Sequence, residues 1–200
     1  LVKLAKTTNY TIVVPIYPKL PRYTVVECFE AIHALYDRLL ENYDTPFLFM
    51  GDSAGGGLAL GLAQDVKRLG KKQPQHVILH SPWLDVTGED PRYEQIEKLD
   101  PMLAVQGAQT LGKMWSKHAG VKNYIVSPLY GELQGIGQIT LFVGTSELLY
   151  VDAQLLVEKA QKENVAIHYF EYDQMNHVFP VFPIPEAKKA FQELVAIIQA

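Results

Sequence analysis

The sequence predicts an α/β fold in which a mostly parallel sheet is covered by helices on both faces. Two patterns lead to this class. Short apolar runs bounded by turn residues, typical of buried parallel strands, alternate with longer stretches whose apolar residues recur three and four positions apart, as on one face of a helix. The 200 residues, 48% of them hydrophobic, are enough for the core of one globular domain.

The apolar runs predict five strands. In chain order they are Tyr10 to Tyr17, Phe47 to Gly51, His76 to His80, Ile139 to Gly144 and Ile167 to Tyr172. Helical spacing predicts four main helices, at Thr24 to Asn42, Ser53 to Leu69, Val151 to Glu163 and Ile184 to Gln199. Strand and helix therefore alternate along the chain, as they do when helical crossovers join parallel strands.

One connection is too long to be a simple crossover. It runs from Ser81 to Gln138 and contains one further helical pattern, Val105 to His118. An insertion of this length predicts a cap over residues 81–124, with the α/β core formed by residues 1–80 and 125–200. Such a cap would lie above the carboxyl edge of the sheet, where substrate pockets form in α/β proteins.

A glycine-rich turn between a strand and a helix supplies the first catalytic candidate. The apolar run from Phe47 leads into Gly-Asp-Ser-Ala-Gly-Gly-Gly at 51–57, and a helical pattern follows. A strand, Gly-x-Ser-x-Gly and a helix together form a nucleophile elbow, in which we expect glycine to be required at Gly51 and Gly55. Ser53 is then the nucleophile, and the Ala54 amide is one oxyanion donor. A phosphate-binding loop would need Lys-Ser/Thr after the glycines, where Leu-Ala stands.

His177 is the predicted general base. Of the six histidines, the other five lie within or beside predicted helices and strands, where a structural histidine is the usual case. His177 instead follows the strand that ends at Tyr172, in a loop at the carboxyl edge of the sheet. It is also the last member in the chain order serine, acid, histidine that such hydrolases use.

Two carboxylates compete for the role of the triad acid. Glu147 lies in the loop that follows the strand Ile139 to Gly144, and we favour it. Asp152 lies where the next helix begins, so it could simply complement the helix dipole. The sequence leaves both open.

Several motifs together resemble the hormone-sensitive-lipase branch of the α/β-hydrolases, the bacterial esterase and acetyl-esterase group. They are Gly51-Asp-Ser-Ala-Gly-Gly56, Ser81-Pro-Trp-Leu-Asp85, Ser127-Pro-Leu-Tyr-Gly131, the loop from Gly144 to Asp152, and Asn176-His177 before an aromatic residue. The resemblance covers the chain from about Tyr10 onward. It implies an α/β-hydrolase that cleaves small acyl esters through a serine acyl-enzyme, with no cofactor and no metal ion.

The chain departs from that family in three places. The family acid is usually aspartate, where Glu147 stands here. Tyr17-Pro-Lys-Leu-Pro21 replaces the customary Tyr-Arg-Leu-Ala-Pro, and the His-Gly-Gly-Gly oxyanion loop has no counterpart. We therefore expect N-terminal strands and the second oxyanion donor in a preceding region on the order of 50 to 100 residues. A strand at Tyr10 that began the sheet would also leave an unpaired apolar edge.

Bulky side chains in the predicted cap and beside His177 are candidates for the substrate pocket. They are Trp83, Met102, Trp115 and Phe179. Because large side chains fill space that a long acyl chain needs, we expect short acyl groups to be preferred.

Charge and composition exclude other classes. A net charge of −4 gives no basic footprint for nucleic acid, and no apolar run approaches the ~20 residues of a membrane span. The single Cys28 permits no intrachain disulfide, which agrees with a cytoplasmic location. The expected partner is a small ester, and a homodimer is an open alternative to a monomer. Two rival functions remain, a non-catalytic binding protein on this scaffold and an amidase or peptidase.

Overall fold

The computed structural model describes residues 1–200 and contains one parallel sheet of four strands. The strands are β1 (Leu48–Asp52), β2 (His76–His80), β3 (Gln138–Gly144) and β4 (Ile167–Tyr172). Their order in the sheet follows their order in the chain, and each neighbouring pair is parallel. All four carboxyl ends therefore meet at one edge, which is where loops can bring side chains from distant parts of the sequence together.

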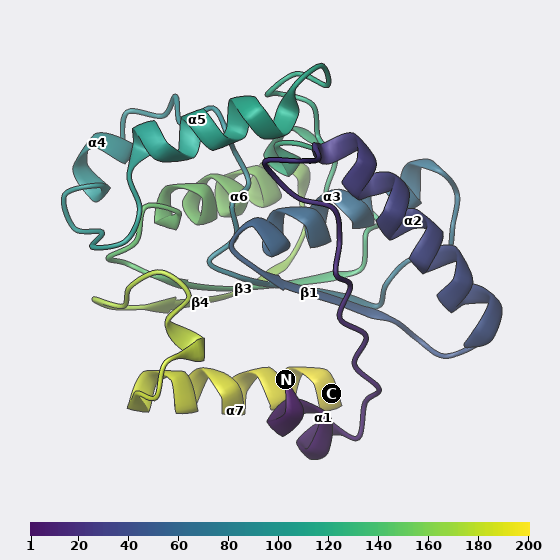
Figure 1. Ribbon diagram of the computed structural model, residues 1–200. Coiled ribbons are helices and arrows are strands. Elements are labelled where there is room, and N and C mark those ends of the chain that lie inside the picture. The colour runs from purple at the N-terminus through teal and green to yellow at the C-terminus, as the bar shows by residue number, and fades with distance from the viewer.

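Helices cover both faces of the sheet (Figure 1). They are α1 (Val2–Thr8), α2 (Val25–Asn42), α3 (Ala54–Arg68), α4 (Tyr93–Ile96), α5 (Val105–Ser116), α6 (Tyr150–Glu163) and α7 (Pro185–Gln199), with 3-10 turns at Pro128–Tyr130 and Phe179–Val181. In Figure 1, α3 and α6 lie above the sheet, whereas α7 and α1 lie below it. The predicted α/β class is confirmed, and no helix is long and apolar enough to cross a bilayer.

The core consists of two main layers because successive residues of a strand point to opposite faces. In β2, all five residues are buried, as expected for an inner strand of a parallel sheet. Val77 and Leu79 pack in the cluster under α3 and α6, while Ile78 packs in the cluster that faces α7. The helices of both faces thus bury apolar surface against the same short strand.

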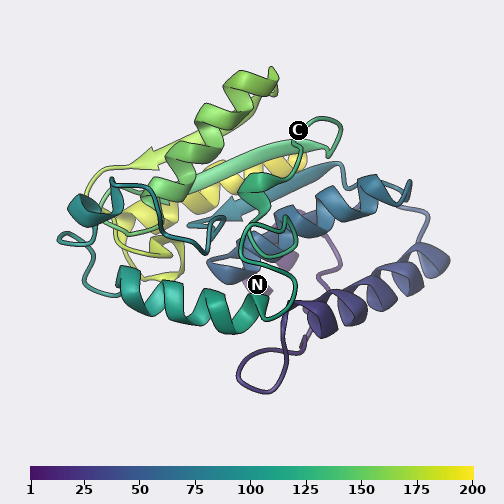
Figure 2. The same ribbon diagram turned by 90° about the horizontal axis from the view of Figure 1, so that it is seen from above.

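The long connection between β2 and β3 carries α4 and α5. Helix α5 lies farther from the sheet than α6 does (Figure 1), and the view from above shows it as the outer helix on one side of the molecule (Figure 2). The predicted helix Val105 to His118 is confirmed, although it ends at Ser116 because Lys117 turns to a positive φ of 43°.

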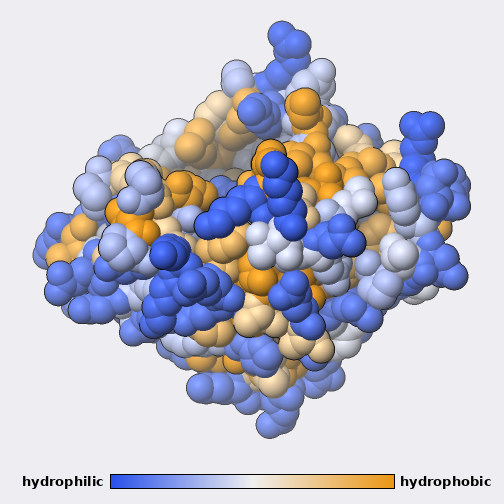
Figure 3. Space-filling view, turned by 90° about the horizontal axis from the view of Figure 1, so that it is seen from below, coloured by the Kyte–Doolittle hydropathy of each residue, from blue (hydrophilic) through white to orange (hydrophobic).

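The predicted strand Tyr10 to Tyr17 is wrong. This segment has no regular secondary structure and runs between α1 and α2 without a ladder partner. Most of its apolar side chains are open to solvent, with Ile16 fully exposed and Val14 59% exposed. A β-branched run becomes a strand only when neighbouring backbone pairs with it, and here no strand does. Hydrophobic residues also reach the surface among charged ones on the face seen from below (Figure 3).

The remaining predicted elements are confirmed, with ends shifted by at most two residues. The short helices α1 and α4 were not predicted. The start of α2 can be predicted from the sequence because it carries a capping pattern, in which the Thr24 N–H donates to Glu27 Oε2 at 2.9 Å. This reciprocal contact belongs to a capping box, whose Thr-x-x-Glu pattern marks a helix start.

Candidate active site

Each of the four strands delivers one polar residue to the carboxyl edge of the sheet. Ser53 follows β1, Ser81 follows β2, Glu147 lies in the loop after β3, and His177 lies in the loop after β4. The parallel order of the strands brings these four residues together, although the first and last are 124 positions apart in the chain.

The turn from β1 into α3 holds Ser53 in a strained backbone conformation. Its φ is 52° and its ψ is −124°, a region that L-residues adopt rarely. The Ser53 N–H donates to the carbonyl of His80 at 3.0 Å, and the Ser53 carbonyl accepts from the Trp83 N–H at 2.9 Å. The start of the loop after β2 thus anchors the elbow on both sides of the serine.

The glycines of the elbow do not all serve the same purpose. A Cβ on Gly51 would lie 2.1 Å from the Gly55 carbonyl oxygen, so glycine is required there as predicted. The same prediction for Gly55 is wrong, because a Cβ at that position meets nothing within 4 Å. Close packing instead requires Gly56 and Gly57, where a Cβ would lie 2.7 Å from Pro82 Cβ and 2.3 Å from the Trp83 carbonyl oxygen.

His177 makes one hydrogen bond through each ring nitrogen. Its Nε2 lies 2.9 Å from Ser53 Oγ, and its Nδ1 lies 2.6 Å from Glu147 Oε2. The loop that carries it packs tightly on the end of β3, since a Cβ on Gly144 would lie 2.1 Å from the Met175 carbonyl oxygen. The Ser146 N–H also donates to that carbonyl at 3.0 Å.

The Glu147 carboxylate has no exposed surface and three hydrogen-bond partners. Oε2 faces His177, while Oε1 accepts from the Ser81 hydroxyl at 2.7 Å and from the Gly144 N–H at 2.8 Å. These donors stabilise a buried negative charge, which would otherwise be costly. A further anchor is Asp100, whose Oδ2 accepts from the Leu148 N–H at 2.6 Å.

Asp152, the other candidate acid, bonds elsewhere. Its Oδ1 accepts from the Asp85 N–H at 2.8 Å and from the Tyr93 hydroxyl at 3.0 Å. Complete burial raises the pKa of Asp152 well above its usual value, and the nearby charge of Asp85 adds to this effect. Of the two carboxylates, Glu147 is therefore the one that the fold places on His177.

Sequence reasoning missed Ser81 and Asp100. Ser81 stands in the motif Ser81-Pro-Trp-Leu-Asp85 and directly follows a predicted strand, a position that could have indicated a site residue. Asp100 stands in an insertion with no strong pattern, so only the folded chain brings it to Leu148.

Ala54 is the first residue of α3, where backbone amides have no acceptor inside the helix. His, Cys, Asp and Glu side chains form no group of three or more that could hold a metal ion.

The predicted pocket residues separate into three environments. Trp83 and Trp115 pack on one apolar cluster with Val86. Met102 is 52% exposed, and its sulfur lies 3.3 Å from the amide nitrogen of Asn176, beside His177. Phe179 has no exposed surface and lies with its ring centroid 4.6 Å from that of Tyr172, in the cluster that faces α7. It therefore lies in the core and not at a pocket mouth.

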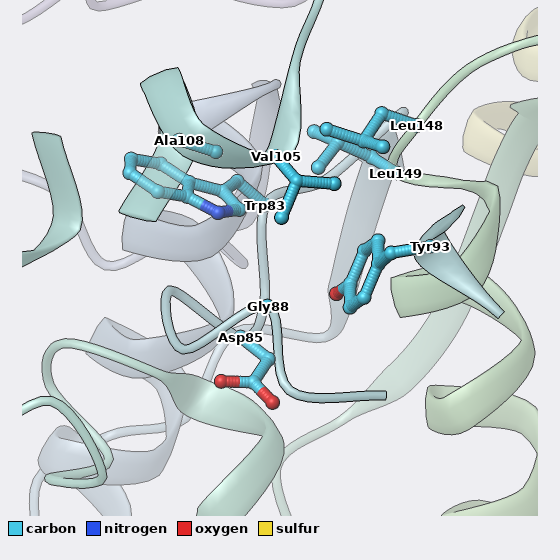
Figure 4. Close-up of a pocket in the computed structure, with 8 residues that line it drawn as sticks. All are labelled: Trp83, Asp85, Gly88, Tyr93, Val105, Ala108, Leu148 and Leu149. Atoms are coloured by element: carbon cyan, nitrogen blue, oxygen red, sulfur yellow. The ribbon is translucent and has the colours of Figure 1, made fainter. Parts of the chain in front are cut away.

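A small cavity lies between the β2–β3 connection and the loop that carries Glu147 (Figure 4). It is lined by Trp83, Asp85, Gly88, Tyr93, Val105, Ala108, Leu148 and Leu149. Its volume of about 10 Å³ matches the space for one water molecule. Helices α4 and α5 therefore close tightly over the residues that follow Glu147.

Two bacterial proteins are similar to this chain in sequence. An esterase of Acinetobacter venetianus is 32% identical over 207 residues, which cover 96% of this chain but 65% of that protein. An acetyl-hydrolase of Streptomyces hygroscopicus is 27% identical over 172 residues, covering 83% of this chain and 57% of that protein. The chain thus spans about two thirds or less of the length of these relatives.

Solved structures of bacterial esterases have the same fold as this chain. A crystal structure of an esterase from the bacterial hormone-sensitive lipase family superimposes with a TM-score of 0.92 at 25% identity, covering 98% of this chain and 67% of that one. An esterase/lipase from an uncultured bacterium gives 0.91 at 26% identity, with 98% and 68% covered. A family model described as the alpha/beta hydrolase fold matches residues 1–181. Because that match takes in nearly the whole chain, the chain belongs to the α/β-hydrolase family, among relatives that are bacterial esterases and acetyl-hydrolases.

Proposed function

We propose that this chain carries the catalytic triad of a serine carboxylesterase, with Ser53 as nucleophile, His177 as general base and Glu147 as acid. The observation that carries the proposal is the continuous pair of hydrogen bonds through His177, 2.9 Å to Ser53 Oγ and 2.6 Å to Glu147 Oε2. These distances lie within the reach that proton transfer from nucleophile to base requires. Esterase and acetyl-hydrolase relatives add support.

The geometry accounts for both halves of the reaction. As Ser53 Oγ attacks the ester carbonyl carbon, its proton passes to His177 Nε2, and the Ala54 N–H donates to the oxyanion that forms. His177 then protonates the departing alkoxide, which leaves as the alcohol, and the acyl group remains on Ser53. Water deprotonated by the same nitrogen attacks the acyl-enzyme and releases the acid. Glu147 stays ionised throughout and stabilises the imidazolium.

The substrate class that we propose is small, uncharged acyl esters. Trp83, Trp115 and Met102 are the proposed contacts, since they lie in or beside the connection that covers the site. Because large side chains such as these fill space that a long acyl chain needs, we expect short acyl groups to be preferred over long ones.

Hydrolysis of p-nitrophenyl acetate, together with labelling by a fluorophosphonate, tests the proposal. We expect turnover and one covalent adduct on Ser53 for the unmodified protein. Ser53→Ala should lose the adduct and slow turnover on the order of a million-fold, because triad members act as a unit. Correct folding of the variant, checked by circular dichroism, is the control. An adduct on another serine, or unchanged turnover in Ser53→Ala, would contradict the assignment. A folded full-length protein without turnover would favour the binding-protein alternative.

A further inference from the structure

Three of the four strands are followed by a residue with a role in the proposed mechanism, and β2 is followed directly by Ser81, which has none. Ser81 has no exposed surface. It lies between the strand that leads to Ser53 and the strand that leads to Glu147, because β2 pairs with both β1 and β3. We propose that Ser81 is a positioning residue, which locks the acid and the histidine loop together through one hydroxyl. This inference rests on the proposed function.

The hydrogen bonds of the Ser81 hydroxyl have a fixed direction. Oγ donates to Glu147 Oε1 at 2.7 Å and accepts the Val178 N–H at 3.1 Å. A backbone amide can only donate, and an ionised carboxylate can only accept. The single hydroxyl proton must therefore point at Glu147, while a lone pair faces the residue directly after His177. One side chain thus contacts both the acid and the loop that carries the base.

The backbone on both sides of this hydroxyl is strained. Ser81 has a φ of 45° and Val178 a φ of 53°, and positive φ is a genuine outlier for a β-branched residue. Such conformations persist when surrounding contacts hold them. The Ser81 N–H donates to the Phe142 carbonyl at 2.8 Å, which ties Ser81 to β3. Its hydroxyl accepts the Val178 N–H and so links Val178, and the neighbouring His177, to β3 as well.

Ser81 also determines how Glu147 divides its hydrogen bonds. Ser81 and the Gly144 N–H both donate to Oε1. Oε2 is therefore left to His177 Nδ1. Without the hydroxyl, Oε1 keeps one donor, the carboxylate can rotate, and the Val178 N–H loses its acceptor. We expect a looser acid–histidine pair and a slower chemical step, with ground-state binding of substrate unchanged.

The test compares Ser81→Ala and Ser81→Gly with a matched control, Ser127→Ala. Ser127 is also fully buried and bridges two segments, since its hydroxyl accepts the Val86 N–H at 3.0 Å and donates to the Val121 carbonyl at 2.6 Å. Its hydroxyl makes no hydrogen bond to Ser53, Glu147 or His177. Ser81→Gly removes the hydroxyl and relieves the positive φ at the same time, so it remains informative if Ser81→Ala fails to fold.

Two readouts are needed. One is kcat and KM for p-nitrophenyl acetate. The other is the proton NMR signal of His177 Nδ1–H, which we expect far downfield because its bond to Glu147 is short. Both Ser81 variants should lower kcat on the order of 10- to 100-fold, the scale of misplacing a reacting group by about 1 Å. KM should stay unchanged, and the signal should move upfield or broaden. Ser127→Ala should change neither readout, whatever it does to the melting temperature.

A Ser81→Gly protein with normal kcat and a normal Nδ1–H signal would overturn the proposal. So would Ser127→Ala if it reduced kcat and shifted the signal as the Ser81 variants do, because the effect would then be one of general stability. The NMR signal needs no substrate. If the unmodified protein hydrolysed no ester, the proposed function would fail, while a signal lost in Ser81→Gly and kept in Ser127→Ala would still support the role of Ser81.

Discussion

At the scale of single residues, the partners of His177 determine which of its nitrogens carries the proton. An ionised carboxylate only accepts hydrogen bonds, so Nδ1 must donate to Glu147 at 2.6 Å. Nε2 is then the unprotonated nitrogen and can accept from Ser53 Oγ at 2.9 Å. The tautomer that a general base needs is therefore built into the resting site.

Replacing each candidate acid by its amide distinguishes Glu147 from Asp152. Glu147→Gln places an amide where the carboxylate stands, and its NH₂ group can donate to Nδ1 and reverse the tautomer. We expect kcat to fall on the order of 10⁴-fold, as for the corresponding change in a Ser-His-Asp triad. The measurement is kcat for p-nitrophenyl acetate.

Asp152→Asn is the matched control for this change. The side-chain oxygen of asparagine can still accept the Asp85 N–H and the Tyr93 hydroxyl, which Asp152 Oδ1 accepts now. Because burial already raises the pKa of Asp152, a neutral amide is a good replacement, and kcat should stay within a few-fold of normal. Greater loss in Asp152→Asn than in Glu147→Gln would transfer the acid role to Asp152.

At the scale of elements, the junction of β1 and α3 depends on how closely strand and helix approach each other. Gly51→Ala would force a Cβ to 2.1 Å from the Gly55 carbonyl oxygen, so the strand must move away from the helix. Gly55→Ala meets nothing within 4 Å and exchanges glycine for a better helix former, a gain of up to about 1 kcal/mol. We predict that Gly51→Ala unfolds or severely destabilises the protein and that Gly55→Ala is neutral or stabilising.

Thermal and urea unfolding of the two variants measures this difference. Both changes add the same methyl group to the same motif, so their contrast isolates the contact at Gly51. Equal destabilisation by the two substitutions would show that the elbow tolerates no side chain for reasons other than this contact.

The elements also show what sequence patterns can and cannot predict. The sequence locates β2 and β4 to the residue, because both are short apolar runs flanked by turn residues. Tyr10–Tyr17 has the same pattern but no ladder partner, and pairing is not written in the run itself. Helix α4, with four residues, is too short for periodicity to reveal. Ser53, Glu147 and His177 follow strand ends, whereas the contact of Asp100 with Leu148 depends on how the long β2–β3 connection folds back.

At the scale of the whole molecule, strand β2 belongs to the core and also supports the candidate site. His80, the last residue of β2, is buried and its ring stacks on Phe142 at a centroid distance of 4.9 Å. Its carbonyl accepts the Ser53 N–H. Burial lowers the pKa of His80 to about 4, from an ordinary value of 6.5. The folded protein therefore keeps this ring neutral at pH values where the unfolded chain protonates it.

This difference predicts how stability depends on pH. Between pH 6.5 and 4, the unfolded chain binds a proton at His80 that the folded protein does not, so the free energy of unfolding falls as the pH falls through this window. Above pH 6.5 both states are neutral at this residue and its contribution is complete. A shift from 6.5 to about 4 corresponds to a loss on the order of 2–3 kcal/mol between pH 7.5 and 4.5.

Replacing His80 by phenylalanine isolates the effect, because the new ring can still stack on Phe142 but cannot take up a proton. Urea unfolding at pH 7.5 and pH 4.5 gives the loss of stability for each protein. Other groups titrate in this range, and Asp152 acts in the opposite direction because its pKa is raised. They contribute equally to both proteins, so they cancel in the comparison. We expect the unmodified protein to lose about 2–3 kcal/mol more than His80→Phe over this interval. Equal losses would mean that His80 is protonated in the folded state, and that burial does not keep the end of β2 neutral beside the site.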